Sequence, residues 1–271
     1  MNFKEIVSEW QRQFPVLLPY TPPTLFAKAD IVLIGLRLDK VMSDSYRVFL
    51  EILPLWVEED KIHIPLLEDE LLNERGLQIF IDRKFHDPTL ADYVEKQRER
   101  GVTVIDANKL ELEKSKRRAI IEKAFECAHR RFDAVLQENV RLSDLFRLID
   151  STPVRGAKHN PLLLHGILEL KLALATYCGD EAFAGKVRKD IEKETGYWNK
   201  EAFLRNFHMS VEEWKTALYR KMEDREVFLK QVDRNKDSEK IARLNSIQIQ
   251  NDVEYRQSLF QRLKDLFLRN Q

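Results

Sequence analysis

The sequence predicts an α+β fold: a small, mainly antiparallel sheet with flanking helices, followed by an α-helical bundle. Nearly every strand-like segment lies between Ala29 and Ile105, and nearly every segment after Asn108 has the apolar period of an amphipathic helix. The change of period predicts two domains, an α+β sheet domain over residues 1–106 and a helical domain over residues 107–271.

The sheet domain should open with a short helix, because apolar residues recur every three or four positions from Phe3 to Phe14. Residues 31–36 form a continuous apolar run, which predicts a strand buried on both faces. Residues 46–52 alternate apolar and polar, which predicts a strand with one face on the core, paired antiparallel with the first. Weaker patterns predict strands at residues 62–66, 77–81 and 102–105, with a helix from Asp87-Pro88 to Gly101 before the last.

The helical domain shows clear start and stop signals. An apolar stripe runs from Ile120 to Leu136, and Asn160-Pro161 and Gly179 bound the next long helix. Ser210 with Glu213 predicts a capping box. Apolar faces over residues 211–232 and 241–267 predict a long antiparallel helical hairpin at the end of the chain.

Composition excludes several classes of protein. Lys and Arg together number 45, as do Asp and Glu, so net charge gives no attraction to nucleic acid or lipid. Eight glycines argue against Gly-rich phosphate loops, and no apolar run is long enough to cross a membrane. Cys127 and Cys178 are expected to be buried free thiols, which with the acidic, amphipathic N-terminus favours the cytoplasm.

Charge is nevertheless uneven along the chain. Residues 58–75 are rich in Asp and Glu, and residues 114–158 are rich in Lys and Arg. We expect both stretches to be solvated faces. Within the second, Lys114, Lys116, Arg117, Arg118, Arg130 and Arg131 are candidates for contacts with nucleic-acid phosphates. No aromatic residues interleave with them, so a salt-bridged helix surface is favoured over that role.

The sharpest candidate for chemistry is the segment 77–84. Asp82 and Lys84 point the same way in a strand, and an acid two residues before a lysine can bind a divalent metal and position a water. If the weak segment at residues 62–66 is left out, the order helix, strand, strand, strand, helix, strand resembles the core of restriction-endonuclease-like nucleases. The resemblance covers residues 1–105 and implies that an upstream acid, Asp44, completes a Mg²⁺ or Mn²⁺ site with Asp82. Ser43 stands before Asp44, where the family often has Pro.

The sequence therefore favours a soluble protein-binding or accessory subunit without catalytic activity or cofactor. Its partner would be another protein, or a second copy, bound through the hairpin at residues 211–271. The alternatives are a nucleic-acid-binding module using the basic stretch and a metal-dependent nuclease using Asp44, Asp82 and Lys84. The nuclease requires these three side chains to converge, and we expect that they do not.

Overall fold

A computed structural model describes residues 3–42, 45–82, 107–153 and 159–253 of the chain. In these residues a mixed sheet has the strand order β5-β4-β3-β2-β8-β7, with β1 paired to β2 and β6 paired to β4. The strands are β1 (Leu18–Pro19), β2 (Thr24–Ala29), β3 (Val32–Met42), β4 (Ser45–Pro54), β5 (Leu67–Glu70), β6 (Ile81–Asp82), β7 (Asn139–Arg141) and β8 (Ser246–Gln250). An α+β fold is confirmed.

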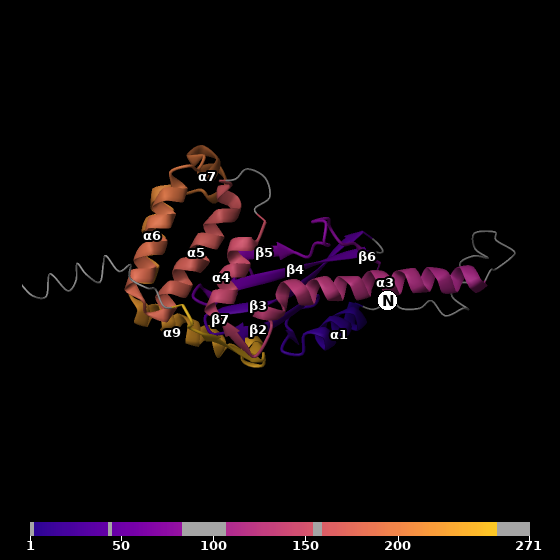
Figure 1. The fold of residues 1–271 in the computed structure, drawn as a ribbon. Coiled ribbons are helices and arrows are strands. Elements are labelled where there is room, and N and C mark those ends of the chain that lie inside the picture. The colour runs from indigo at the N-terminus through magenta and orange to yellow at the C-terminus, as the bar shows by residue number, and fades with distance from the viewer. Residues whose placement is uncertain (1–2, 43–44, 83–106, 154–158, 254–271) are drawn as a thin grey trace, which may run out of the picture.

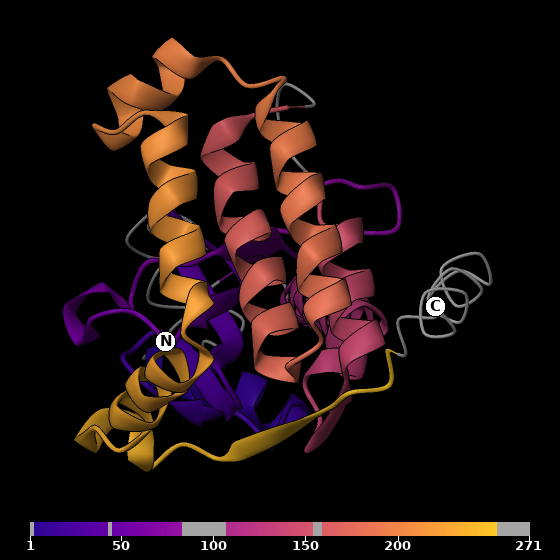
Figure 2. The same cartoon turned by 90° about the vertical axis from the view of Figure 1, so that its left-hand side faces the viewer.

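Helices lie along the sheet and beside one of its ends (Figure 1). They are α1 (Phe3–Gln13), α3 (Ala107–Phe132), α4 (Leu142–Ser151), α5 (Pro161–Cys178), α6 (Glu181–Thr195), α7 (Lys200–Phe207), α8 (Val211–Glu223), α9 (Arg225–Lys236) and α10 (Glu239–Ala242), with short 3₁₀ turns at Glu59–Lys61 and Asp133–Val135. Helices α6, α7, α8 and α9 all contact α5, and these five helices form a helical lobe (Figure 2).

The core of the sheet follows from the pleat of β3 and β4. Pairing Ile34 with Ile52 and Leu36 with Leu50 gathers apolar side chains on one face, and all four are buried. On α1, Trp10 is fully buried, and its Nε1 donates a hydrogen bond of 2.9 Å to the hydroxyl of Tyr46.

Helix ends match the sequence signals closely. The Asn160 side chain accepts from the N–H of Leu162 at the start of α5, and Gly179 closes that helix in the left-handed region. Ser210 and Glu213 form the predicted capping box of α8. The apolar stripe that starts on α3 is buried as predicted from Ile121 to Leu136 except for Phe125, which is half-buried, and Ile120 is exposed.

One prediction about the distribution of strands is wrong. Strands β7 and β8 lie after residue 110, so the sheet is not confined to residues 1–105. β8 pairs parallel with both β2 and β7, and therefore the sheet draws strands from both sides of the predicted boundary at residue 106. Two domains, 1–106 and 107–271, stay a prediction.

The predicted final helix is also wrong where the structure describes it. The chain forms α10 and then β8, instead of one helix from Ile241 to Phe267. Ile247 and Ile249 alternate with exposed polar residues, a local period of two that outweighs the longer helical spacing. Residues 254–267 lie outside the described part of the chain, as do the helix predicted at 87–101 and the strand at 102–105.

Two predictions about strands in the first hundred residues also need correction. Residues 62–66 do not form a strand, and the chain enters the sheet at Leu67 instead. Of the strand predicted at 77–81, only Ile81 lies in a strand, as part of β6.

Helix α5 is the one described helix that is long and apolar enough to span a membrane by length and composition. Half of it is buried inside the protein, and core helices of soluble proteins pass the same test.

Candidate functional site

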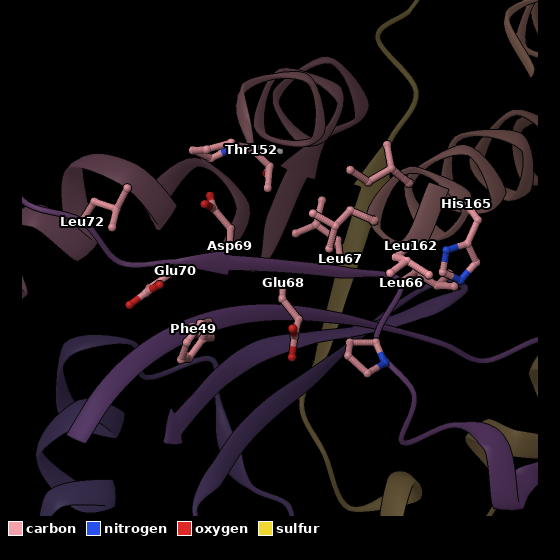
Figure 3. Close-up of a pocket in the computed structure, with 14 residues that line it drawn as sticks. Phe49, Leu66, Leu67, Glu68, Asp69, Glu70, Leu72, Thr152, Leu162 and His165 are labelled. Atoms are coloured by element: carbon pink, nitrogen blue, oxygen red, sulfur yellow. The ribbon is translucent and has the colours of Figure 1, made fainter. Parts of the chain in front are cut away.

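The edge strand β5 forms one wall of a cavity of about 240 Å³, which we call the β5 groove. The opposite wall comes from the end of α4 and the start of α5. Figure 3 shows Asp69 on the same side of the strand as Thr152, and Glu68 and Glu70 on the opposite side with Phe49. The lining residues are Phe49, Pro65, Leu66, Leu67, Glu68, Asp69, Glu70, Leu72, Thr152, Pro153, Leu162, Leu163, His165 and Ile167.

Within the part of the chain that the structure describes, β5 has an open main-chain edge. Among the described strands it pairs with β4 alone, in an antiparallel ladder. The N–H of Leu71 donates to the carbonyl of Val48 at 2.9 Å, which fixes which residues of β5 face β4. Hydrogen-bonded and non-hydrogen-bonded residue pairs alternate along an antiparallel ladder. The N–H and C=O of Glu68 therefore point away from β4, toward the open side of β5.

Both ends of this edge are closed by the chain itself. Leu72 forms an isolated antiparallel bridge with Gln78, beyond a turn at Asn73–Gly76. At the other end Gly166 of α5 lies so close to Leu66 that a Cβ at Gly166 would be 2.5 Å from the Leu66 carbonyl oxygen. The open stretch is therefore short and centred on Glu68.

Beside the groove, one face of β3, β4 and β5 carries a network of ionised side chains, which we call the charged face. It consists of Arg37, Asp39, Arg47, Glu51, Glu68 and Glu70. Arg37 bonds Glu51 at 2.5 Å and Glu68 at 2.7 Å. The strand register explains the network, because Gly35, Glu51 and Glu68 lie directly across from one another.

Glu51 is the most perturbed acid of the charged face. Its side chain is only 7% exposed. Burial raises its pKa from the ordinary 4.5 to about 6, Arg37 opposes this rise, and the neighbouring Glu68 adds to it. Perturbed acids beside a cavity are typical of functional sites, and ion-pair networks also produce them.

Two titratable groups that line the groove, Asp69 and His165, are held by contacts within the protein. Asp69, on the opposite face from Glu68, is 2% exposed and pairs with Arg131 of α3 at 2.8 Å. Burial raises the pKa of Asp69, and Arg131 opposes the rise. Burial lowers the pKa of His165, whose Nδ1 lies 3.0 Å from the carbonyl of Pro161. A neutral imidazole with its proton on Nδ1 fits this contact.

The acidic and basic stretches of the sequence meet at this site. Arg130 and Arg131 of α3 bind Glu74 and Asp69, and Arg118 binds Glu122 within α3. Three of the six candidates for phosphate contact are thus paired with carboxylates, as expected for a salt-bridged helix surface. Lys116 is exposed, and the side chains of Lys114 and Arg117 lie outside the described set.

Of the nuclease candidates, only Asp82 falls within the described residues. Its main chain pairs with Ser45 at the start of β4, next in sequence to Asp44. Asp44 and Lys84 lie outside the described part of the chain. Among the described residues, no group of three or more His, Cys, Asp or Glu side chains could hold a metal ion.

Sequence reasoning missed the β5 groove because the segment Leu67–Glu70 reads LEDE, which has no strand pattern. Its acids were expected on a solvated face, yet Asp69 and Glu70 are buried. The only signal was the concentration of acids in residues 58–75.

Comparison with protein-family models, curated proteins and solved structures found no match to this chain.

Proposed function

We propose that this protein is a soluble binding protein, without catalytic activity of its own, that holds an extended segment of a partner protein along the open edge of β5. The observation that carries the proposal is the N–H and C=O of Glu68 pointing out of the ladder beside a cavity. Strand addition uses main-chain hydrogen bonds of this kind for affinity and neighbouring pockets for specificity.

Apolar side chains at the groove support the proposal. Leu162 and Leu163 line it and are 43% and 40% exposed, and Ile64, which precedes the lining residue Pro65, is 54% exposed. Exposed apolar groups gathered around a cavity are typical of interaction sites. A partner segment lying on β5 would cover them.

The proposed surface differs from the one that the sequence favoured. Residues 246–250 belong to the sheet, so a helical hairpin over 211–271 cannot extend unbroken through them. Association with another protein or a second copy through residues 211–271 stays a prediction. A cytoplasmic location likewise rests on composition alone.

The proposal is tested by selecting binders from a library of random peptides on the full-length protein. Three proteins are compared: wild type, Glu68→Ala and Glu68→Pro. Proline removes the outward N–H, and an edge strand tolerates this because that N–H is not part of the ladder. Alanine removes the same carboxylate and keeps the N–H.

We expect selected peptides to bind Glu68→Pro at least about tenfold more weakly than Glu68→Ala. Equal affinity for the two variants would contradict strand addition. Circular dichroism checks that both are folded. If Glu68→Pro is not, alternate amides of the peptide are N-methylated instead, and only one alternating set should abolish binding to wild type.

One alternative has a specific observation in its favour. The pairing of Asp82 with Ser45 is compatible with a metal-dependent nuclease that uses Asp44, Asp82 and Lys84 with Mg²⁺ or Mn²⁺. Metal-dependent cleavage of DNA or RNA that is lost in Asp82→Ala would place this function first.

A further inference from the structure

We infer that the partner segment alternates basic and apolar residues, with a basic side chain over Glu68. This inference rests on the proposed strand addition to β5 and names the chemistry of the partner. It follows from the pleat, because side chains directly opposite one another on neighbouring strands share a face of the sheet.

Among the described residues, the charged face carries more acidic than basic side chains. It carries four carboxylates, Asp39, Glu51, Glu68 and Glu70, against the guanidinium groups of Arg37 and Arg47. Glu68 is its most exposed carboxylate, at 45%, and lies at the open edge of the sheet. A lysine or arginine added opposite Glu68 would lie on the same face.

The opposite face of β5 offers a different environment. Asp69 points there, and its charge is matched by Arg131 at 2.8 Å. The other groups on this side are largely apolar, including Leu67, Leu162 and Ile167. A partner residue opposite Asp69 would therefore meet the apolar wall of the groove.

The same charges disfavour a second copy of this chain as the occupant. Two β5 strands paired edge to edge would bring Glu68, Asp69 and Glu70 of one copy against the same acids of the other. Like charges directly opposite in a ladder are destabilising, and edge strands use them to prevent self-pairing.

The test measures binding of four synthetic peptides to the full-length protein by fluorescence anisotropy at low salt. One peptide alternates Lys and Val, one alternates Glu and Val, and one has the Lys and Val residues in two separate blocks. The fourth copies residues 65–72 of this chain. We expect the alternating Lys–Val peptide to bind at least about tenfold more tightly than each of the others.

Charge reversal provides the matched test. Glu68→Lys should weaken the Lys–Val peptide by about fivefold and strengthen the Glu–Val peptide. If both alternating peptides bind wild type equally and both are weakened by Glu68→Pro relative to Glu68→Ala, the basic preference is wrong and strand addition stands. If neither peptide distinguishes Glu68→Pro from Glu68→Ala, strand addition itself fails.

Discussion

The residue that best shows what the fold imposes on a side chain is Glu51. It lies in the middle of β4, 7% exposed, with its carboxylate on the guanidinium of Arg37. The pKa of Glu51 is raised to about 6, so burial destabilises the ionised carboxylate by more than Arg37 stabilises it. Its ionisation is therefore expected to reduce stability.

Replacing Glu51 by Gln should reveal this cost as a function of pH. The folded protein holds the Glu51 proton up to about pH 6, whereas the unfolded chain loses it near 4.5. Stability from this group is therefore present at low pH and falls as pH rises through that window. The Glu51→Gln variant should match wild type near pH 4.5 and exceed its free energy of unfolding by up to about 2 kcal/mol at pH 7.

Urea unfolding of both proteins between pH 4.5 and 7.5 measures the difference. Glu68→Gln, at the 45% exposed neighbouring position, is the control and should differ from wild type by no more than about 0.5 kcal/mol. A Glu51→Gln protein that is less stable than wild type at pH 7, by a margin that grows with pH, would show that the ion pair outweighs burial.

A second experiment at the residue scale concerns Asp82. The purified protein should cut neither DNA nor RNA with Mg²⁺ or Mn²⁺, because Ser43 stands before Asp44, where restriction-endonuclease-like nucleases often have Pro. The assay is gel electrophoresis of plasmid DNA and a structured RNA. Cleavage that Asp82→Ala abolishes, with the circular dichroism spectrum unchanged, would reverse our order of hypotheses.

At the scale of elements, α9 shows how the helical lobe is attached to the sheet. Phe228 was expected to be buried, and it is, with its ring centroid 5.7 Å from that of Trp56. Phe260, which was expected to be buried as well, lies outside the described residues. Asn235 adds two hydrogen bonds of 2.7 Å to the carbonyls of Leu55 and Val57, just beyond β4.

Removing the Phe228 ring should therefore loosen α9. Phe228→Ala is expected to lower the free energy of unfolding by about 3–5 kcal/mol, because a buried aromatic ring leaves a cavity. Val227 is the adjacent residue on the same helix and is 60% exposed, so Val227→Ala is the control and should change stability by no more than about 0.5 kcal/mol. Equal melting temperatures for the two variants would mean that α9 does not pack as described.

Elements with local signals were predictable from the sequence. Asn160, Pro161 and Gly179 mark α5 by backbone chemistry that needs no tertiary context. β5 and β8 were not predictable. Leu67–Glu70 is too polar for a strand pattern, and β8 enters the sheet between β2 and β7, two partners distant in sequence. The groove was missed because Glu68 lies on an open edge only through the pairing of β5 with β4, and the sequence of β5 does not indicate that pairing.

The whole molecule depends on β8 to join the two halves of the chain. β8 contacts β2 and β7 in parallel pairing, and Ile249 N–H donates to the carboxylate of Asp30 at 2.7 Å. This carboxylate lies in the tight turn between β2 and β3. A strand in this position should make the two segments unfold together.

Ile247→Ala tests that coupling, because Ile247 is 1% exposed in the middle of β8. We expect a loss of about 2–5 kcal/mol in one cooperative transition. Amide exchange of β3 and of α5 should accelerate to the same extent. Acceleration confined to α5 would support separate folding of residues 1–106 and 107–271.

The central claim, that a partner segment adds to β5, is tested most directly at the amide of Glu68. In the free protein this amide should exchange with solvent faster than those of Leu67 and Asp69, which face β4. Nuclear magnetic resonance measures the exchange before and after a saturating peptide from the library selection is added. Our account predicts that the peptide slows exchange at Glu68 at least about tenfold. Tight binding that leaves exchange at Glu68 unchanged would contradict it.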